Sequence, residues 1–150
     1  MQKQIYEHRQ IGTLIILVFS SAILLLTVGA ATGPFTPSLF LLGSILAVLI
    51  ICLILFCTLT VQVNNNKIVV FFGPGLIRKT IRVKEIRDAQ IVKNPWYYGW
   101  GIRLLPRGWL YNVSGFDAVA LTLKNDRKYR IGTDDPNGLL AAIQQVLKEN

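Results

Sequence analysis

Residues 11–31 read IGTLIILVFSSAILLLTVGAA, and residues 39–59 read LFLLGSILAVLIICLILFCTL. Neither run contains an Asp, Glu, Lys, Arg or His residue. An apolar helix of about 20 residues crosses the roughly 30 Å hydrocarbon core of a bilayer, because its backbone hydrogen bonds are satisfied internally. Residues 32–38, between the runs, include a glycine and two prolines, which suit a tight turn. The sequence therefore predicts a transmembrane helical hairpin.

The first apolar run has a second interpretation, as a secretory signal peptide. Lys3 and Arg9 precede the run, and Val28–Ala31 supply small residues near its end. The run is longer than the apolar region of about 7–15 residues that signal peptides contain, which favours a membrane span. If the signal peptide were cleaved, the second run would cross the membrane alone. The domain that follows it would then lie on the same side of the membrane as in the uncleaved hairpin.

Charge is distributed unevenly along the chain. Residues 60–150 carry 14 of the 16 Lys and Arg residues and 7 of the 8 acidic residues, for a net charge of +7. Residues 1–10 form a short tail with a net charge of +1, and the turn between the runs is uncharged. Lys and Arg collect on the cytoplasmic flanks of membrane spans. We therefore expect both termini, and the domain at residues 60–150, in the cytoplasm.

After the second run the apolar residues change to a period of two, which is typical of strands with one buried face. Asp135, Pro136 and the apolar stripe that follows predict a closing helix, with Asp135 as its N-cap. The strands that this pattern predicts cover residues 59–63, 67–72, 77–83, 86–92, 101–112 (as a hairpin), 119–123 and 129–131.

Three stretches are distinctive: NPWYYGWGIR at 94–103, GWLYNVSG at 108–115 and YRIGTDDP at 129–136. With the two N-terminal spans, they resemble the bacterial pleckstrin-homology-like (PH-like) domain of small membrane proteins. The resemblance implies an α+β membrane protein of the bacterial cytoplasmic membrane, with an antiparallel β-barrel or sandwich capped by a C-terminal helix. Residues 64–67 hold one positive charge where inositol-phosphate-binding relatives cluster several, so we do not expect that ligand.

An aromatic segment is the first candidate binding surface. Trp and Tyr combine an apolar body with a polar tip and favour membrane and protein interfaces. The alternative is that these side chains pack over the barrel. The candidate contact residues are Trp96, Tyr97, Tyr98, Trp100, Arg103 and Trp109.

A basic strand is the second candidate. Arg78, Arg82 and Lys84 are spaced to share one face, where each would contribute about 1 kcal/mol against an anionic leaflet. The alternative is an ordinary solvated face. Nucleic acid is not an expected partner, because no recognition-helix or RNA-binding strand motif is present.

Catalytic motifs are not found in the sequence. The one histidine, His8, lies in the tail, and both cysteines, Cys52 and Cys57, lie in the second span. We therefore expect no catalytic residue, metal or cofactor. The predicted function is a membrane-anchored scaffold that contacts anionic headgroups or a protein partner. The alternative is an accessory subunit of a larger membrane complex, acting through its hairpin, in which Gly43 and Ala47 allow close helix packing.

Overall fold

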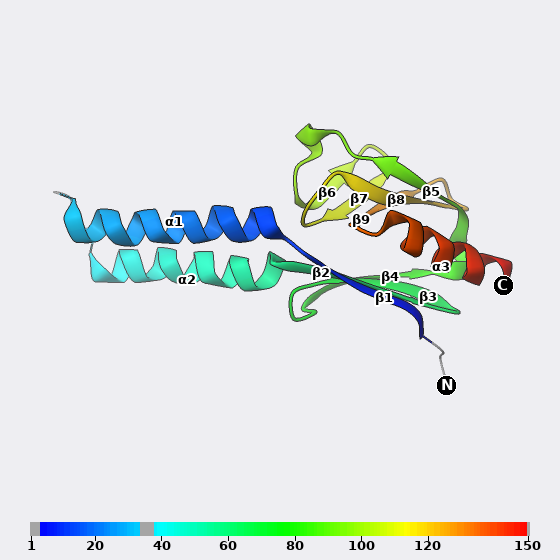
Figure 1. The fold of residues 1–150 in the computed structure, drawn as a ribbon, viewed down its shortest axis with the longest axis horizontal. Helices are drawn as coiled ribbons and strands as arrows, with labels where there is room; N and C mark the ends of the chain where they lie inside the picture. The colour runs from blue at the N-terminus through cyan, green and yellow to red at the C-terminus, as the bar shows by residue number, and fades with distance from the viewer. Residues whose placement is uncertain (1–3, 34–37, 150) are drawn as a thin grey trace.

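The computed structural model describes residues 4–33 and 38–149 and is an α+β fold (Figure 1). Two helices, α1 (Thr13–Thr32) and α2 (Leu39–Phe56), lie side by side and project from a domain of two β-sheets. At 1.5 Å per residue they are about 30 and 27 Å long, which is enough to cross a bilayer. Of their described residues only Ile15 is buried, so both helices present apolar side chains to their surroundings.

The apolar runs extend beyond the helices on the domain side. Ile11 ends strand β1 (Gln4–Ile11), and Thr58 begins strand β2 (Thr58–Asn64), so the predicted spans 11–31 and 39–59 were too long there. Leu59 is apolar because it lies in the core of the sheets, where it is 1% exposed. The predicted turn falls mainly on residues 34–37, which lie outside the described residues.

The first sheet has the order β1-β2-β3-β4 and is antiparallel, with β3 (Lys67–Phe72) and β4 (Ile77–Arg82) completing it. The segment interpreted as a tail, residues 1–10, therefore contains most of an edge strand. The sequence did not predict this strand because most of its residues are polar. An edge strand of a half-solvated sheet needs few apolar side chains. Signal-peptide cleavage after Ala31 would remove this strand from the sheet.

The second sheet has the order β5-β8-β9-β7-β6. The β8–β9 hairpin inserts between β5 and β7, so β9 runs parallel to β7. The prediction of antiparallel strands throughout was wrong for the pair β7–β9. The described residues form nine strands, and β1 is the one that the sequence did not predict. The strands are β5 (Ile86–Lys93), β6 (Gly101–Leu105), β7 (Gly108–Asn112), β8 (Asp117–Leu123) and β9 (Lys128–Gly132), with short 3₁₀ turns η1 (Val83–Glu85) and η2 (Trp96–Tyr98).

The core lies between the two sheets and under helix α3 (Pro136–Lys148), which contacts strands of both sheets. Val63 and Ile68 of the first sheet, Leu121 of the second and Ile143 of α3 are all 0% exposed. Asp135 caps α3 as predicted, since its Oδ1 accepts a hydrogen bond of 3.0 Å from the Gly138 N–H. The closing helix is thus confirmed in both position and role.

Each membrane-length helix leads directly into a strand of the first sheet. One residue, Gly12, separates β1 from α1, and one residue, Cys57, separates α2 from β2. We call the end of the domain at these two residues the helix-proximal end, and the opposite end the helix-distal end. No flexible linker stands between the helices and the domain.

Candidate functional site

Two loops, one from each sheet, lie at the helix-proximal end of the domain (Figure 1). The first, residues 73–76, joins β3 to β4; the Gly73 N–H donates a hydrogen bond of 2.9 Å to the carbonyl of Thr58, two residues after α2 ends. A Cβ added to Gly73 would lie 2.4 Å from the carbonyl oxygen of Ile54, so this loop is packed on the end of α2. The second loop, residues 94–100, joins β5 to β6.

Leu76 in the first loop has a large apolar side chain that is 78% exposed. A leucine exposed to this degree contributes little to the core, and it belongs to the loop whose Gly73 packs on the end of α2. Leu76 was not among the predicted contact residues, because it lies in the short turn between the predicted strands 67–72 and 77–83. The available signal was an isolated leucine directly after a glycine–proline turn.

The second loop carries Trp96 and Tyr97, which are 77% and 67% exposed. Their rings form an edge-to-face pair with centroids 6.2 Å apart, and Tyr97 packs in the same way on Tyr98 at 5.1 Å. Such pairs are favourable ring geometries. The two exposed rings therefore belong to an ordered cluster on the surface.

Hydrogen bonds hold the aromatic loop against the second sheet. The Asn94 N–H donates to the Phe116 carbonyl at 2.6 Å, and Arg130 Nη1 donates to Asn94 Oδ1 at 3.0 Å. The Arg130 guanidinium also lies 5.5 Å from the centre of the Tyr98 ring, within the range of a cation–π contact. The loop is thus fixed at its base while its tip is exposed.

The predicted aromatic surface is divided by the fold. Trp100 packs against the core and lies 6.2 Å from the ring of Phe116, so its role includes packing. Trp109 lies at the start of β7, beside the turn to β6 and away from the helices. Trp96, Tyr97, Tyr98, Trp100 and Arg103 stay together near the helices, and Trp109 does not join them.

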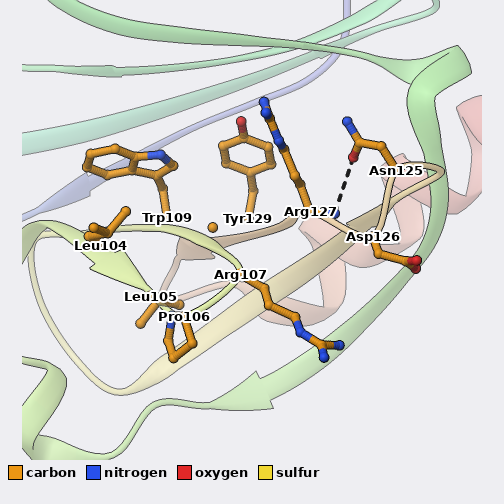
Figure 2. Close-up of a pocket in the computed structure, with 10 residues that line it drawn as sticks. Leu104, Leu105, Pro106, Arg107, Trp109, Asn125, Asp126, Arg127 and Tyr129 are labelled. Carbon is orange, nitrogen blue, oxygen red and sulfur yellow. Dashed lines mark hydrogen bonds between the residues drawn. The ribbon is translucent and has the colours of Figure 1, made fainter.

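Trp109 instead lines a hollow of about 860 Å³ at the helix-distal end (Figure 2). Figure 2 shows Trp109, Tyr129 and Arg127 side by side and pointing the same way, while Arg107 points in the opposite direction. The Arg127 N–H donates to Asn125 Oδ1 at 3.2 Å, which shapes the turn beneath. This hollow offers aromatic and cationic groups at a distance from the membrane-length helices.

The three residues of the predicted basic face are spread along the domain. Arg78 and Arg82 are both exposed, as their spacing predicts, but four residues of strand separate them by about 13 Å. Arg82 pairs with Lys67 across the sheet, beside the helix-distal turn, and it forms an ion pair of 3.7 Å with Glu85. Lys84 lies beyond the strand, in η1. Arg78 alone of the three lies toward the helix-proximal end.

The sequence placed His8 in a tail outside the domain, but the structure shows that it contacts the domain. Its Nε2 contacts Asp134 Oδ1, and the neighbouring Tyr6 hydroxyl donates a hydrogen bond of 3.0 Å to Asp135 Oδ2. Burial, together with the contact to Asp135, raises the pKa of Tyr6. These contacts tie the edge strand β1 to the N-terminus of α3, which is a structural role.

Groups suited to catalysis are not gathered in the described part of the chain. No three His, Cys, Asp or Glu residues there are arranged to hold a metal ion. Burial and the neighbouring Tyr129 raise the pKa of Tyr111 to about 12. Tyr111 stacks on Tyr129 inside the core, with ring centres 6.5 Å apart.

The chain matches no protein-family model and no curated protein sequence. The two loops and the helices are therefore the features from which a function is inferred.

Proposed function

We propose that this chain is a membrane-anchored, non-catalytic binding module whose domain rests end-on against the cytoplasmic leaflet. The observation that carries the proposal is the position of three exposed side chains, Leu76, Trp96 and Tyr97, on helix-proximal loops of different sheets. Trp and Tyr favour the headgroup region of a bilayer. Burying a leucine contributes about 2 kcal/mol, which is ample for a domain that is already tethered.

Two loops from different sheets support a defined orientation of the domain. With α1 and α2 between them, the loops give contacts on both sides of the hairpin (Figure 1). Because each helix continues into a strand after a single residue, tilting the domain would also require bending at Gly12 and Cys57. We call Leu76, Trp96 and Tyr97 the docking residues.

The charge distribution supports a cytoplasmic location of the domain. The domain carries the net charge of +7, and β1 pairs with β2, so the N-terminal segment lies on the same side as the domain. Positive charge is retained on the cytoplasmic side of a membrane. A bacterial cytoplasmic membrane is the location that we infer from the PH-like resemblance.

We infer that the domain is a divergent bacterial PH-like domain. Two packed sheets and a C-terminal helix support this assignment, while the parallel β7–β9 pair departs from the expected antiparallel pattern. The helix-distal end then faces the cytosol. The hollow lined by Trp109, Arg107 and Arg127 supports a protein partner there, because Trp and Arg are enriched at protein interfaces.

The proposal is tested with the full chain, since a fragment that starts at residue 60 would lack β1. A variant with Trp100→Phe and Trp109→Phe leaves Trp96 as the single tryptophan, and it is reconstituted in phosphatidylcholine vesicles. We expect lipid with brominated acyl chains to quench Trp96 emission and aqueous acrylamide to quench it weakly.

The matched control keeps Trp109 alone, with Trp96→Phe and Trp100→Phe. Because Trp109 lies at the helix-distal end, acrylamide should quench it and brominated lipid should not. If Trp96 behaves like Trp109, the docking proposal is wrong.

The alternative function, an accessory subunit acting through the hairpin, has one observation in its favour. A Cβ added to Gly43 would meet no atom within 4 Å, so Gly43 does not serve the packing of α2 on α1. Its surface is open to another helix. If Gly43→Leu with Ala47→Leu breaks up a larger complex in native membranes while the domain stays folded, the alternative is supported; an unchanged complex size removes it.

A further inference from the structure

A cavity of about 560 Å³ lies between the first turns of α1 and the start of β6. Its walls are formed by one side of α1, the end of α2 and the segment 99–103 of the second sheet. No protein side chain among the described residues fills it. The residues that matter for its chemistry are Leu14, Val18, Phe19, Phe56, Trp100 and Arg103.

The cavity lies at the boundary between polar and apolar surroundings. Leu14 and Phe19 occupy the first two turns of α1, within about 9 Å of the helix-proximal end of a helix that is about 30 Å long. A helix of that length fills the hydrocarbon core, so these turns lie just inside the acyl region. Segment 99–103, on the opposite wall, leads from the aromatic loop into β6, and the proposed docking would place it at the level of the headgroups.

The lining of the cavity is amphipathic. The wall from the helices is entirely apolar, and Arg103 is the single ionisable side chain among the described residues that line the cavity. A Cβ added to Gly99 would lie 3.4 Å from Arg103 Nη2, so the guanidinium lies against the turn at Gly99. Trp100 Nε1 also belongs to this wall and has no hydrogen-bond partner in the described chain.

We propose that this cavity binds one anionic phospholipid of the adjacent leaflet, with an acyl chain against α1 and the phosphate at Arg103. The inference rests on the proposed docking of the domain. Charge complementarity selects the occupant, because a single cation without a neighbouring acid in the lining matches a phosphate group. An oxygen of the headgroup or of the ester region would also accept a hydrogen bond from Trp100 Nε1 after a small shift of the ring.

A lipid fits this position better than a helix from another protein, because the lining places an apolar wall of α1 opposite the single cation Arg103. A lipid chain is narrower and flexible, and it reaches the site from the bilayer without displacing any part of the domain.

The test uses the full chain with Trp96→Phe and Trp109→Phe, so that Trp100 reports from the cavity wall. The protein is reconstituted in phosphatidylcholine vesicles that contain a few per cent of either brominated phosphatidylglycerol or brominated phosphatidylcholine. We expect phosphatidylglycerol to quench Trp100 at about fivefold lower mole fraction, which corresponds to one charge contact of about 1 kcal/mol. Arg103→Gln should abolish this preference.

Arg107→Gln is the matched control, because Arg107 is exposed in the β6–β7 turn at the other end of β6 and should leave the preference intact. Equal quenching by the two lipids, or a preference that survives Arg103→Gln, would overturn the proposal. So would an absence of quenching, which is the result expected if a protein segment fills the site. If Trp96 is quenched by lipid while Trp100 shows no preference, docking stands and the lipid site alone is wrong.

Discussion

The Gly12 N–H donates a hydrogen bond of 2.8 Å to the carbonyl oxygen of Cys57. These are the two residues at which the helices become strands, so the bond joins the two connections between hairpin and domain. A Cβ on Gly12 would lie 3.2 Å from the Cys57 oxygen and from Val113 Cβ, which shows how closely the second sheet approaches this junction. The hairpin and the domain are therefore joined at this junction by a hydrogen bond and by close packing, as well as by the chain itself.

The first prediction concerns Gly73, which packs on the end of α2. Gly73→Ala should destabilise the protein by about 2 kcal/mol or more, because φ is +47° there and the new Cβ would meet the Ile54 carbonyl at 2.4 Å. Thermal unfolding of the detergent-solubilised full chain, followed by circular dichroism, measures the effect. Gly29→Ala in α1 is the control, since a Cβ there meets nothing within 4 Å. Equal unfolding temperatures for the two variants would contradict the prediction.

The second prediction concerns the bond between Tyr6 and Asp135. Tyr6→Phe should cost about 1–2 kcal/mol, because it removes a hydrogen bond to a carboxylate that also caps α3. Urea unfolding of the solubilised chain provides the free energy. Tyr97→Phe is the control, because the Tyr97 side chain is 67% exposed. A loss no greater than that of the control would show that β1 is held by its strand pairing alone.

The third prediction concerns alkaline stability. The pKa of Tyr111 is about 12 in the folded protein, compared with about 10 in an unfolded chain. The folded state therefore binds this proton more tightly, so the contribution to stability is complete below pH 10 and is lost as the pH rises from about 10 to about 12. Tyr111→Phe should make the fall in stability across that interval less steep. Urea unfolding at several pH values measures the slope, and an unchanged slope would refute the assignment.

The fourth prediction separates surface from core in the aromatic loop. Trp96→Ala should change the free energy of unfolding in detergent by no more than about 0.5 kcal/mol, because the side chain is 77% exposed. Trp100→Ala should cost about 3 kcal/mol, because the ring packs against the core. Urea unfolding followed by circular dichroism measures both. A large loss for Trp96→Ala would mean that the ring has a packing role and would weaken its assignment to docking.

The sequence predicted the elements whose patterns are local. Two uncharged runs of sufficient length predicted α1 and α2, and alternation predicted β2, β3 and most of the second sheet. The Asp135-Pro136 pair located the start of α3, because capping depends on residues within one turn. Strand β1 was missed because its stability comes from pairing with β2 and from contacts such as that of Tyr6 to Asp135, both remote in sequence.

The candidate site was predicted only in part. The composition of segment 96–100 indicated an interface, but which rings are exposed depends on how the segment is anchored by Asn94 and Arg130. The sequence signal for Leu76 was weak, a single leucine after a glycine–proline turn, and only the packing of that loop on the end of α2 makes the residue a candidate. The basic residues Arg78 and Arg82 share a face as their spacing predicted, yet the direction of β4 carries Arg82 away from the helices.

By itself, then, the sequence determined that two helices suited to a membrane precede a β-rich domain with a closing helix, because hydrophobic length, alternation and capping are properties of neighbouring residues. The tertiary structure decided which end of that domain meets the helices and which side chains are exposed there. It also created the cavity beside Arg103, since that space exists only where α1 and β6, about 90 residues apart, face each other across the junction.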